Sequence, residues 1–153
     1  MGLKKNEILL VGSPLEIVLV EEKDGSLTTI IGGKNYVDLP NNLKGKKISH
    51  NHPTNSPFSL EDMKVFIEGQ LSEIRVITKD GFIYSIRNPK KTKLDFTEIK
   101  KSYDKFYDEA KKLSDKKVEK GLIKESDIKK EIIRIQWELI AKEKGFLYEQ
   151  KKW

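Results

Sequence analysis

Short apolar runs separated by turn residues occupy the first half of the chain and predict β-strands. Residues 15–20 are almost continuously apolar, which is typical of a strand buried on both faces. Asp24-Gly25 supplies a tight turn from that strand into the apolar stretch 27–31, so the two segments predict a hairpin. Shorter apolar stretches predict further strands at residues 7–11, 36–39, 46–50, 74–77 and 82–86.

In the second half the spacing of apolar residues changes to three and four positions, which predicts helices. One helix follows residue 95 and is interrupted at Gly121. A second helix runs from about Asp127 to Gly145, a residue type that commonly ends helices. A shorter helix begins after Ser59, a good N-cap, between two of the predicted strands. The large aromatic residues of this half are expected to pack the helical pair onto the sheet; they are Trp137, Phe146, Tyr148 and Trp153.

Together these patterns predict an α/β fold, in which a mixed central sheet is followed by a C-terminal helical hairpin. We expect an α/β domain over residues 1–90 and a helical extension over residues 91–153 packed on it. A chain of 153 residues is long enough to bury such a core without disulfides or metals as staples.

The composition removes several classes of protein. The chain has no Cys, so disulfides, thiolate zinc sites, iron–sulfur clusters and cysteine nucleophiles are excluded. No apolar run approaches the about 20 residues of a membrane span, and the short apolar stretch after residue 7 does not resemble a signal peptide. We therefore expect a soluble, cytoplasmic protein with no membrane partner.

The positive charge is concentrated in the second half. The whole chain carries +6, and residues 81–153 hold 20 Lys and Arg against 13 Asp and Glu, a net of +7. Such a half could attract nucleic acid or another acidic partner through its basic helices. The lysines alternate with acidic residues, however, which is typical of solvated helix faces.

The only two histidines of the chain, His50 and His52, flank Asn51. Alternate residues of a strand point to the same side, so two imidazoles at this spacing can converge on one ion. Without Cys the third ligand should be a carboxylate, and Asp62 follows in the first turn of the short helix. Two imidazoles and one carboxylate leave a zinc ion one open position, as in catalytic sites. The competing interpretation is a polar strand end with two surface imidazoles.

A hydrolytic zinc site needs two further groups. A carboxylate must accept the proton of the attacking water, and Glu16, embedded in the apolar strand expected over residues 15–20, is the best candidate. Glu21 and Glu22 are rival bases at the end of that strand. Ser59 is the best candidate to support the oxyanion. The spacing of Ser59 and Asp62 also fits a capping box, which would require the Asp62 side chain to point differently from a metal ligand.

The sequence His-Asn-His-Pro followed by Ser-x-x-Asp, with a glutamate upstream, resembles the JAMM (MPN-plus) metallohydrolases. The resemblance implies a JAB/MPN, cytidine-deaminase-like sheet, with zinc bound by His50, His52 and Asp62. It also implies that Glu16 is the general base and that Ser59 supports the tetrahedral intermediate. The His-Asn-His-Pro spelling is similar to the RadC-like branch and to JAB-like domains of phage head-morphogenesis proteins. The similarity spans residues 15–87.

Two functions follow as hypotheses. The first is a zinc-dependent hydrolase that cleaves an amide bond, peptide or isopeptide, in a protein or peptide substrate. The second is a phage- or mobile-element-encoded accessory or inhibitor protein that keeps a JAB-like fold and binds a protein or nucleic acid. An HNH nuclease is disfavoured because its motif letters are dispersed rather than consecutive. A zinc deaminase is disfavoured because it needs a pair of Cys.

Overall fold

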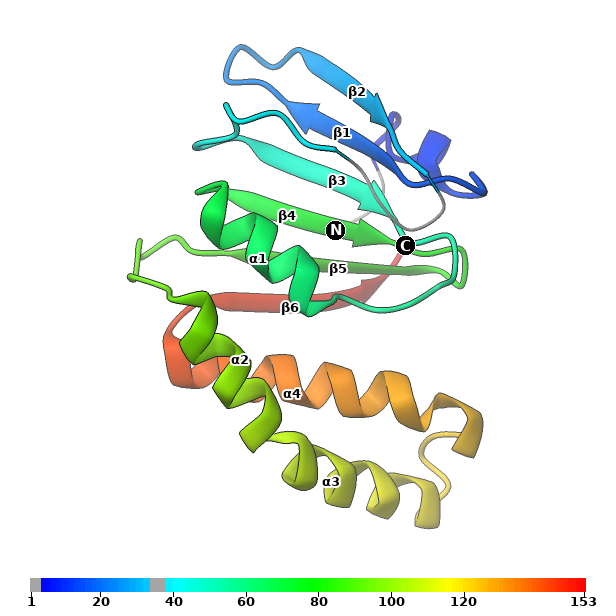
Figure 1. Ribbon diagram of the computed structural model, residues 1–153. Helices are drawn as coiled ribbons and strands as arrows, with labels where there is room; N and C mark the ends of the chain where they lie inside the picture. Colours follow the sequence, from blue (N-terminus) through cyan, green and yellow to red (C-terminus); the bar gives the residue numbers. More distant parts are fainter. Residues whose placement is uncertain (1–3, 34–37) are drawn as a thin grey trace.

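Six strands form one mixed sheet in the computed structural model, which describes residues 4–33 and 38–153 (Figure 1). The strand order is β2-β1-β3-β4-β5-β6, and β3 and β4 form the one parallel pair among the described strands. The predicted α/β class with a mixed sheet is therefore confirmed. The strands are β1 (Ile17–Glu21), β2 (Leu27–Ile31), β3 (Lys47–Asn51), β4 (Glu73–Ile77), β5 (Phe82–Arg87) and β6 (Leu147–Lys152).

Four α-helices accompany the sheet. The helix α1 (Leu60–Glu68) provides the crossover between β3 and β4 and lies across one face of the sheet (Figure 1). The other three gather near the β6 edge; they are α2 (Phe96–Lys105), α3 (Tyr107–Glu119) and α4 (Ile128–Lys144), with a 3-10 turn, η2 (Glu125–Asp127), before α4. No helix in the described part of the chain combines the length and apolarity needed to cross a membrane.

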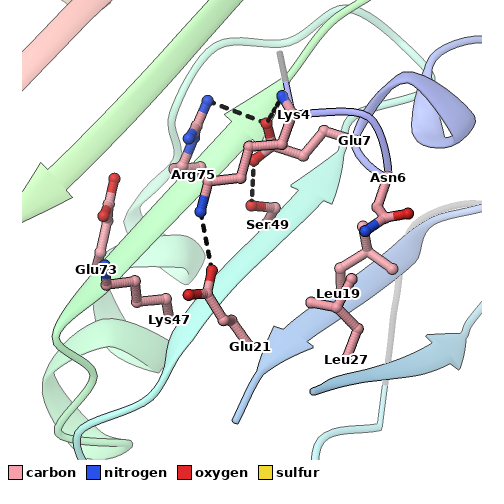
Figure 2. A pocket seen from close by; sticks show the side chains of 10 residues that line it. All are labelled: Lys4, Asn6, Glu7, Leu19, Glu21, Leu27, Lys47, Ser49, Glu73 and Arg75. Carbon is pink, nitrogen blue, oxygen red and sulfur yellow. Dashed lines mark hydrogen bonds and ion pairs between the residues drawn. The ribbon is translucent and has the colours of Figure 1, made fainter. Parts of the chain in front are cut away.

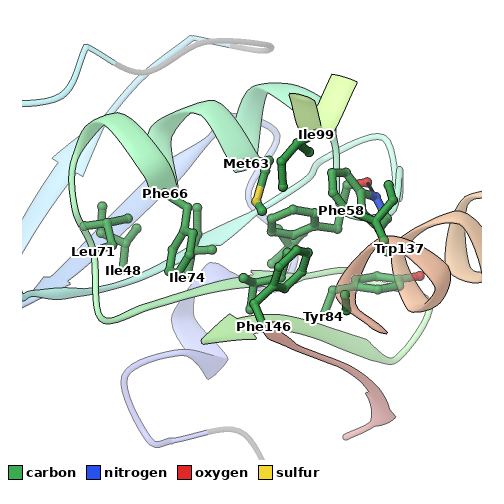
Figure 3. Packing of buried hydrophobic residues seen from close by; sticks show 14 of the residues in the cluster. Ile48, Phe58, Met63, Phe66, Leu71, Ile74, Tyr84, Ile99, Trp137 and Phe146 are labelled. Carbon is green, nitrogen blue, oxygen red and sulfur yellow. Dashed lines mark hydrogen bonds between the residues drawn. The ribbon is translucent and has the colours of Figure 1, made fainter. Parts of the chain in front are cut away.

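The main core joins one face of the sheet to α1, α2 and α4 (Figure 3). Its largest fully buried side chain is Trp137 of α4. The Trp137 ring meets Phe58 edge to face at 5.1 Å, and its Nε1 donates a hydrogen bond to the carbonyl oxygen of Phe58 at 3.0 Å. Because Phe58 immediately precedes the N-cap of α1, this contact ties the C-terminal helices to the loop that enters α1. The packing role expected for Trp137, Phe146 and Tyr148 is confirmed. The same expectation is wrong for Trp153, which is 45% exposed and lies outside this core.

The prediction of a strand at residues 7–11 is wrong, because this segment contains a 3-10 turn, η1 (Ile8–Leu10). Glu7 and Leu10 are buried against the face of the sheet opposite α1, while Ile8 and Leu9 are 56% and 76% exposed. Figure 2 shows why Glu7 is buried: its carboxylate lies 3.1 Å from the Arg75 guanidinium and accepts the Ser49 hydroxyl at 2.6 Å. A short apolar run does not by itself distinguish a strand from a turn of helix.

Two further expectations differ from the structure in detail. In the strand expected at 36–39, Tyr36 and Val37 lie outside the described residues, and Asp38 and Leu39 belong to no strand. The first of the two expected C-terminal helices is in fact two, because the chain bends at Phe106 between α2 and α3, where the Phe106 ring packs against the core. Gly145 ends α4 in the left-handed conformation, as predicted.

The strand β6 was not predicted. It pairs with β5 along its whole length, from Leu147 opposite Arg87 to Lys152 opposite Phe82. The segment is mostly polar because it is the edge of the sheet, where charged side chains face water. The sequence of β6 therefore lacks the apolar run from which the other strands were predicted. The C-terminal residues thus add a strand to the same sheet that contains β1.

We expect Trp137→Phe to lower the free energy of unfolding by about 1–3 kcal/mol, because the smaller ring leaves a cavity and the buried Phe58 carbonyl loses its donor. Chemical denaturation measures the change. Trp153→Phe is the matched control: Trp153 Nε1 also donates to a carbonyl, that of Thr78, but Trp153 is 45% exposed, so water can replace the bond. Equal losses in the two variants would contradict the assigned role of Trp137.

A charged cluster joins α3 to α4. Glu131 of α4 accepts hydrogen bonds from Arg134 in the same helix and from Lys117 of α3, both at 2.5 Å. The Arg134 guanidinium, assisted by Lys117, lowers the pKa of Glu131 from its usual 4.5 to about 2, against the opposing effect of partial burial. Since the folded state favours the ionised carboxylate, the cluster stabilises the fold above pH 4.5 and loses this effect as the pH falls towards 2.

We expect Glu131→Gln to cost about 1–2 kcal/mol of unfolding free energy at pH 7, a figure reduced for screening by solvent. The difference from the wild type should shrink as the pH falls from 4.5 to 2, because the wild-type carboxylate is then protonated. Urea unfolding across this range measures it. Glu119→Gln, at an exposed position of α3, is the control and should change the unfolding free energy at pH 7 by less than about 0.5 kcal/mol. A constant Glu131→Gln penalty down to pH 2 would refute the electrostatic origin.

Candidate metal centre

Three side chains from two neighbouring elements converge on one point. His50 lies in β3, His52 follows its last residue, and Asp62 lies in the first turn of α1. Each of the three residues is 7% exposed. Their ligand atoms all lie within 4.8 Å of one another, so the group could hold a metal ion. The alternation of β3 and the start of α1, both predicted from the sequence, bring the three residues together.

The distances match the donor spacing of a small metal site. The Nε2 atoms of His50 and His52 are 3.1 Å apart. Asp62 Oδ1 lies 2.7 Å from His50 Nε2, and Asp62 Oδ2 lies 3.4 Å from His52 Nε2. Tetrahedral zinc with bonds of about 2.0–2.1 Å would place neighbouring donors about 3.3 Å apart. The two imidazoles and the carboxylate therefore fit a cation of this size with little movement.

A single orientation of the Asp62 side chain completes the capping box and also faces the two histidines, although these two arrangements were expected to need different orientations. Asp62 Oδ2 accepts hydrogen bonds from the backbone N–H and the hydroxyl of Ser59, each at 2.8 Å, while the Asp62 N–H donates to Ser59 Oγ at 3.2 Å. This completes a capping box for α1. The other oxygen, Oδ1, faces His50. The expectation of different side-chain directions is wrong, because one carboxylate oxygen contacts Ser59 while the other contacts His50.

Electrostatics keeps Asp62 ionised although it is buried. Burial raises the pKa of the Asp62 carboxyl, but the charges and hydrogen bonds of His50 and His52 outweigh this effect and hold the pKa well below its usual range. Burial lowers the pKa of His52, but the hydrogen bond and charge of Asp62, together with the Ser56 carbonyl and nearby Glu16, outweigh it, so the net shift is upward. A metal ligand must be a neutral imidazole, so a cation and a proton compete for His52 Nε2.

The outer nitrogen of His52 is also held. His52 Nδ1 donates to the carbonyl oxygen of Ser56 at 2.8 Å, which directs the lone pair of Nε2 towards His50 and Asp62. Metal-binding histidines commonly have such a carbonyl partner. Sequence reasoning missed Ser56, because a backbone carbonyl leaves no signal in the residue type. His50 Nδ1 is buried without a hydrogen-bond partner among the described residues, so the His50 ring is oriented through Nε2.

A cleft of about 410 Å³ opens beside the three ligands, and Glu16 lines it with them. Glu16 lies one residue before β1 rather than inside a strand, which corrects its expected position. Burial raises the pKa of its carboxyl, an effect that nearby Asp62 reinforces and that His50 and His52 oppose. Glu16 therefore lies in the same cleft as His50, His52 and Asp62 but is not one of the three residues that could hold a metal ion. The apolar remainder of the cleft is lined by Val18, Leu39, Ile48, Val65 and Ile74.

The rival bases lie elsewhere. Glu21 ends β1, at the far end of the strand from Glu16, and pairs with Lys4 at 2.9 Å. Glu22 pairs with Lys46 at 2.7 Å. Neither lines the cleft. Of the three glutamates considered from the sequence, the structure brings only Glu16 to the ligand group.

Ser59 lines the cleft, but its hydroxyl is engaged. Its single proton is donated to Asp62 Oδ2, and its oxygen accepts the Asp62 N–H. The N-cap role is confirmed. The role of Ser59 as an oxyanion donor stays a prediction, because it requires that proton to leave Asp62.

Comparison with protein-family models, curated proteins and solved structures found no match. The chemistry of this site therefore rests on its own residues: a buried His-His-Asp group able to hold a metal ion, beside a carboxylate in an open cleft.

We expect the protein to bind about one equivalent of Zn²⁺, and the double substitution His50→Ala/His52→Ala to abolish binding. Asp62→Asn should weaken binding by at least about 100-fold, because the amide replaces an anionic ligand. Glu61→Gln is the matched control, since Glu61 is the neighbouring acidic residue of the same helical turn but no member of the ligand group. Isothermal titration calorimetry measures each affinity. Full binding by the double variant would exclude this site.

Proposed function

We propose that the protein is a zinc-dependent hydrolase that cleaves amide bonds, in the manner of the JAMM metallohydrolases. The observation that carries the proposal is the meeting of Glu16 with the His50, His52 and Asp62 group in one cleft. A ligand set of two imidazoles and one carboxylate leaves an open coordination position, which is a property of catalytic rather than structural zinc sites. A peptide or isopeptide is the substrate class that this proposal implies.

The residues of the chain would divide the reaction between them. Zinc in such a site supplies Lewis acidity and lowers the pKa of water to about 7. Glu16 would accept the proton of the attacking water and pass it to the nitrogen of the leaving amine. The upward shift of the Glu16 pKa suits this role, because a more basic carboxylate holds the proton between the two steps. Ser59 would keep Asp62 Oδ2 occupied, so that Oδ1 stays directed towards His50.

The cleft also suits a polymeric substrate. Its lining combines charged residues, among them Glu16 and Asp62, with apolar residues such as Ile48 and Val65. A segment of peptide could place a side chain against the apolar part while its amide group lies near His50 and Glu16. Burial of apolar area would then contribute to binding without touching the reacting atoms.

The alternative, an accessory protein that binds an acidic partner through its basic helices, gains less support. Many of the cations on these helices are already paired with acidic residues of the same region. Examples are Lys105 with Glu143 and Lys111 with Asp115. Such pairing reduces the charge available to a partner and is typical of a solvated helical surface.

We expect Glu16→Gln to lower kcat by about 10²–10⁴-fold while the Zn²⁺ affinity stays within about threefold, because the variant loses the proton acceptor but no ligand. The assay uses zinc-loaded protein with a quenched fluorescent peptide library and an isopeptide-linked lysine substrate. Glu21→Gln and Glu22→Gln are the controls and should retain activity. Absence of cleavage by the zinc-loaded wild type, or equal cleavage by Glu16→Gln, would refute the proposal.

A further inference from the structure

Asn51 lies between the two histidines in the sequence, but its side chain forms hydrogen bonds with the backbone at the start of β1. Its Oδ1 accepts the backbone N–H of Ile17 at 2.7 Å, and its Nδ2 donates to the carbonyl oxygen of Leu15 at 2.9 Å. A longer contact of 3.4 Å joins Nδ2 to the Ser13 carbonyl. Asn51 is only 3% exposed, so the carboxamide is a buried group whose donor and acceptor are both in use.

These bonds replace a backbone ladder that ends at this point. The pairing of β1 with β3 runs from Glu21 opposite Lys47 to Val18 opposite His50 and goes no further. Beyond Asn51 the chain turns towards β4, where the His52 N–H donates to the Ile77 carbonyl at 3.1 Å. The Asn51 carboxamide therefore supplies to the start of β1 the hydrogen bonds that a continued β3 backbone would have made.

These hydrogen bonds hold the backbone on both sides of Glu16. Leu15 and Ile17, the two partners of Asn51, are the immediate neighbours of Glu16 in the chain. On the opposite side the Glu16 backbone pairs with the two glycines that follow β2. The Glu16 N–H donates to the Gly33 carbonyl oxygen, and the Glu16 carbonyl oxygen accepts from the Gly32 N–H, both at 2.8 Å. The Glu16 carboxylate makes no hydrogen bond to any residue of ranges 4–33 and 38–153, so only its backbone is fixed.

We propose that Asn51 is a positioning residue that holds Glu16 beside the metal ligands, an inference that rests on the proposed function. The segment between the two ligands thereby sets the place of the base: His50 and His52 present their rings on one side, and Asn51 reaches across to the chain that carries Glu16. A displacement of about 1 Å between reacting groups can cost about 100-fold in rate, so this anchoring matters for turnover.

The chemistry of the anchor explains the residue type. The position needs one acceptor for the Ile17 N–H and one donor for the Leu15 carbonyl, and a primary amide offers both from a single short side chain. An ionised Asp would keep the acceptor but place a second oxygen against the Leu15 carbonyl. Ala would offer neither group.

The test compares Asn51→Ala with Asn88→Ala in the zinc-loaded protein. Asn88 is a matched control, because its side chain makes the same pair of bonds, to the carbonyl and the N–H of Thr92, in an exposed loop. We expect Asn51→Ala to lower kcat by about 10–100-fold with KM and Zn²⁺ affinity within about threefold. Amide hydrogen exchange at Ile17 should accelerate by about tenfold. Asn88→Ala should change none of these quantities.

Two further variants separate positioning from general loss of structure. In a Glu16→Gln background the Asn51→Ala change should cost less than about twofold in kcat, because its effect passes through Glu16. If Asn51→Ala does not fold, Asn51→Asp decides. It keeps the acceptor, so exchange at Ile17 should stay within about threefold of the wild type. Its kcat should still fall, because the Leu15 contact is lost.

The outcomes distinguish this inference from the proposed function. Unchanged Ile17 exchange in Asn51→Ala overturns the inference, whether or not the protein cleaves peptides. So does faster exchange with an unchanged kcat, or a full additional loss in the Glu16→Gln background. If the wild type cleaves nothing, the proposed function fails, and the Ile17 exchange rates by themselves decide whether Asn51 holds the segment that carries Glu16.

Discussion

A buried carboxylate must find within the protein the hydrogen bonds that it loses with water. For Asp62 this requirement fixes the positions of His50, His52 and Ser59 around it. Four groups meet the requirement: two imidazoles face the carboxylate, and the backbone and hydroxyl of Ser59 bind its second oxygen. The same contacts begin α1 and direct His50 and His52 towards one point. A helix start and a candidate metal centre are therefore one arrangement, and neither can be changed without affecting the other.

That arrangement depends on parts of the chain far from it. Ser59 is placed by the loop before α1, and this loop is anchored when Trp137 of α4 donates to the carbonyl of Phe58. The helix α4 is in turn followed directly by β6, which completes the sheet beside β5. The C-terminal helices thus support the placement of His50, His52 and Asp62 without contributing a residue to this group. They belong to the same core as α1 and the central strands.

The N-terminal part of the chain provides the other wall of the cleft, where Glu16 lies. Residue Glu16 reaches the cleft because β1 pairs with both β2 and β3 and because Asn51 continues the second of these pairings. On the other face of the sheet the Glu7–Arg75 pair and η1 cover β1 and β4, so that β1 is buried on both sides. A strand held in this way fixes the backbone of Glu16 beside His50, His52 and Asp62.

Features that depend on local spacing could be predicted from the amino-acid sequence. Alternation placed the two histidines on one side of a strand, and the interval from Ser59 to Asp62 predicted the start of α1. Contacts between residues far apart in the chain became visible once the chain was folded: Asn51 and Ile17 are separated by 34 residues, and Trp137 and Phe58 by 79. The tertiary structure also brought Glu16, and neither Glu21 nor Glu22, to the cleft beside the histidines, and it placed a polar C-terminal segment in the sheet as β6. Periodicity and capping act over a few residues, whereas these choices depend on which strands pair and which side chains lose their water when the core closes.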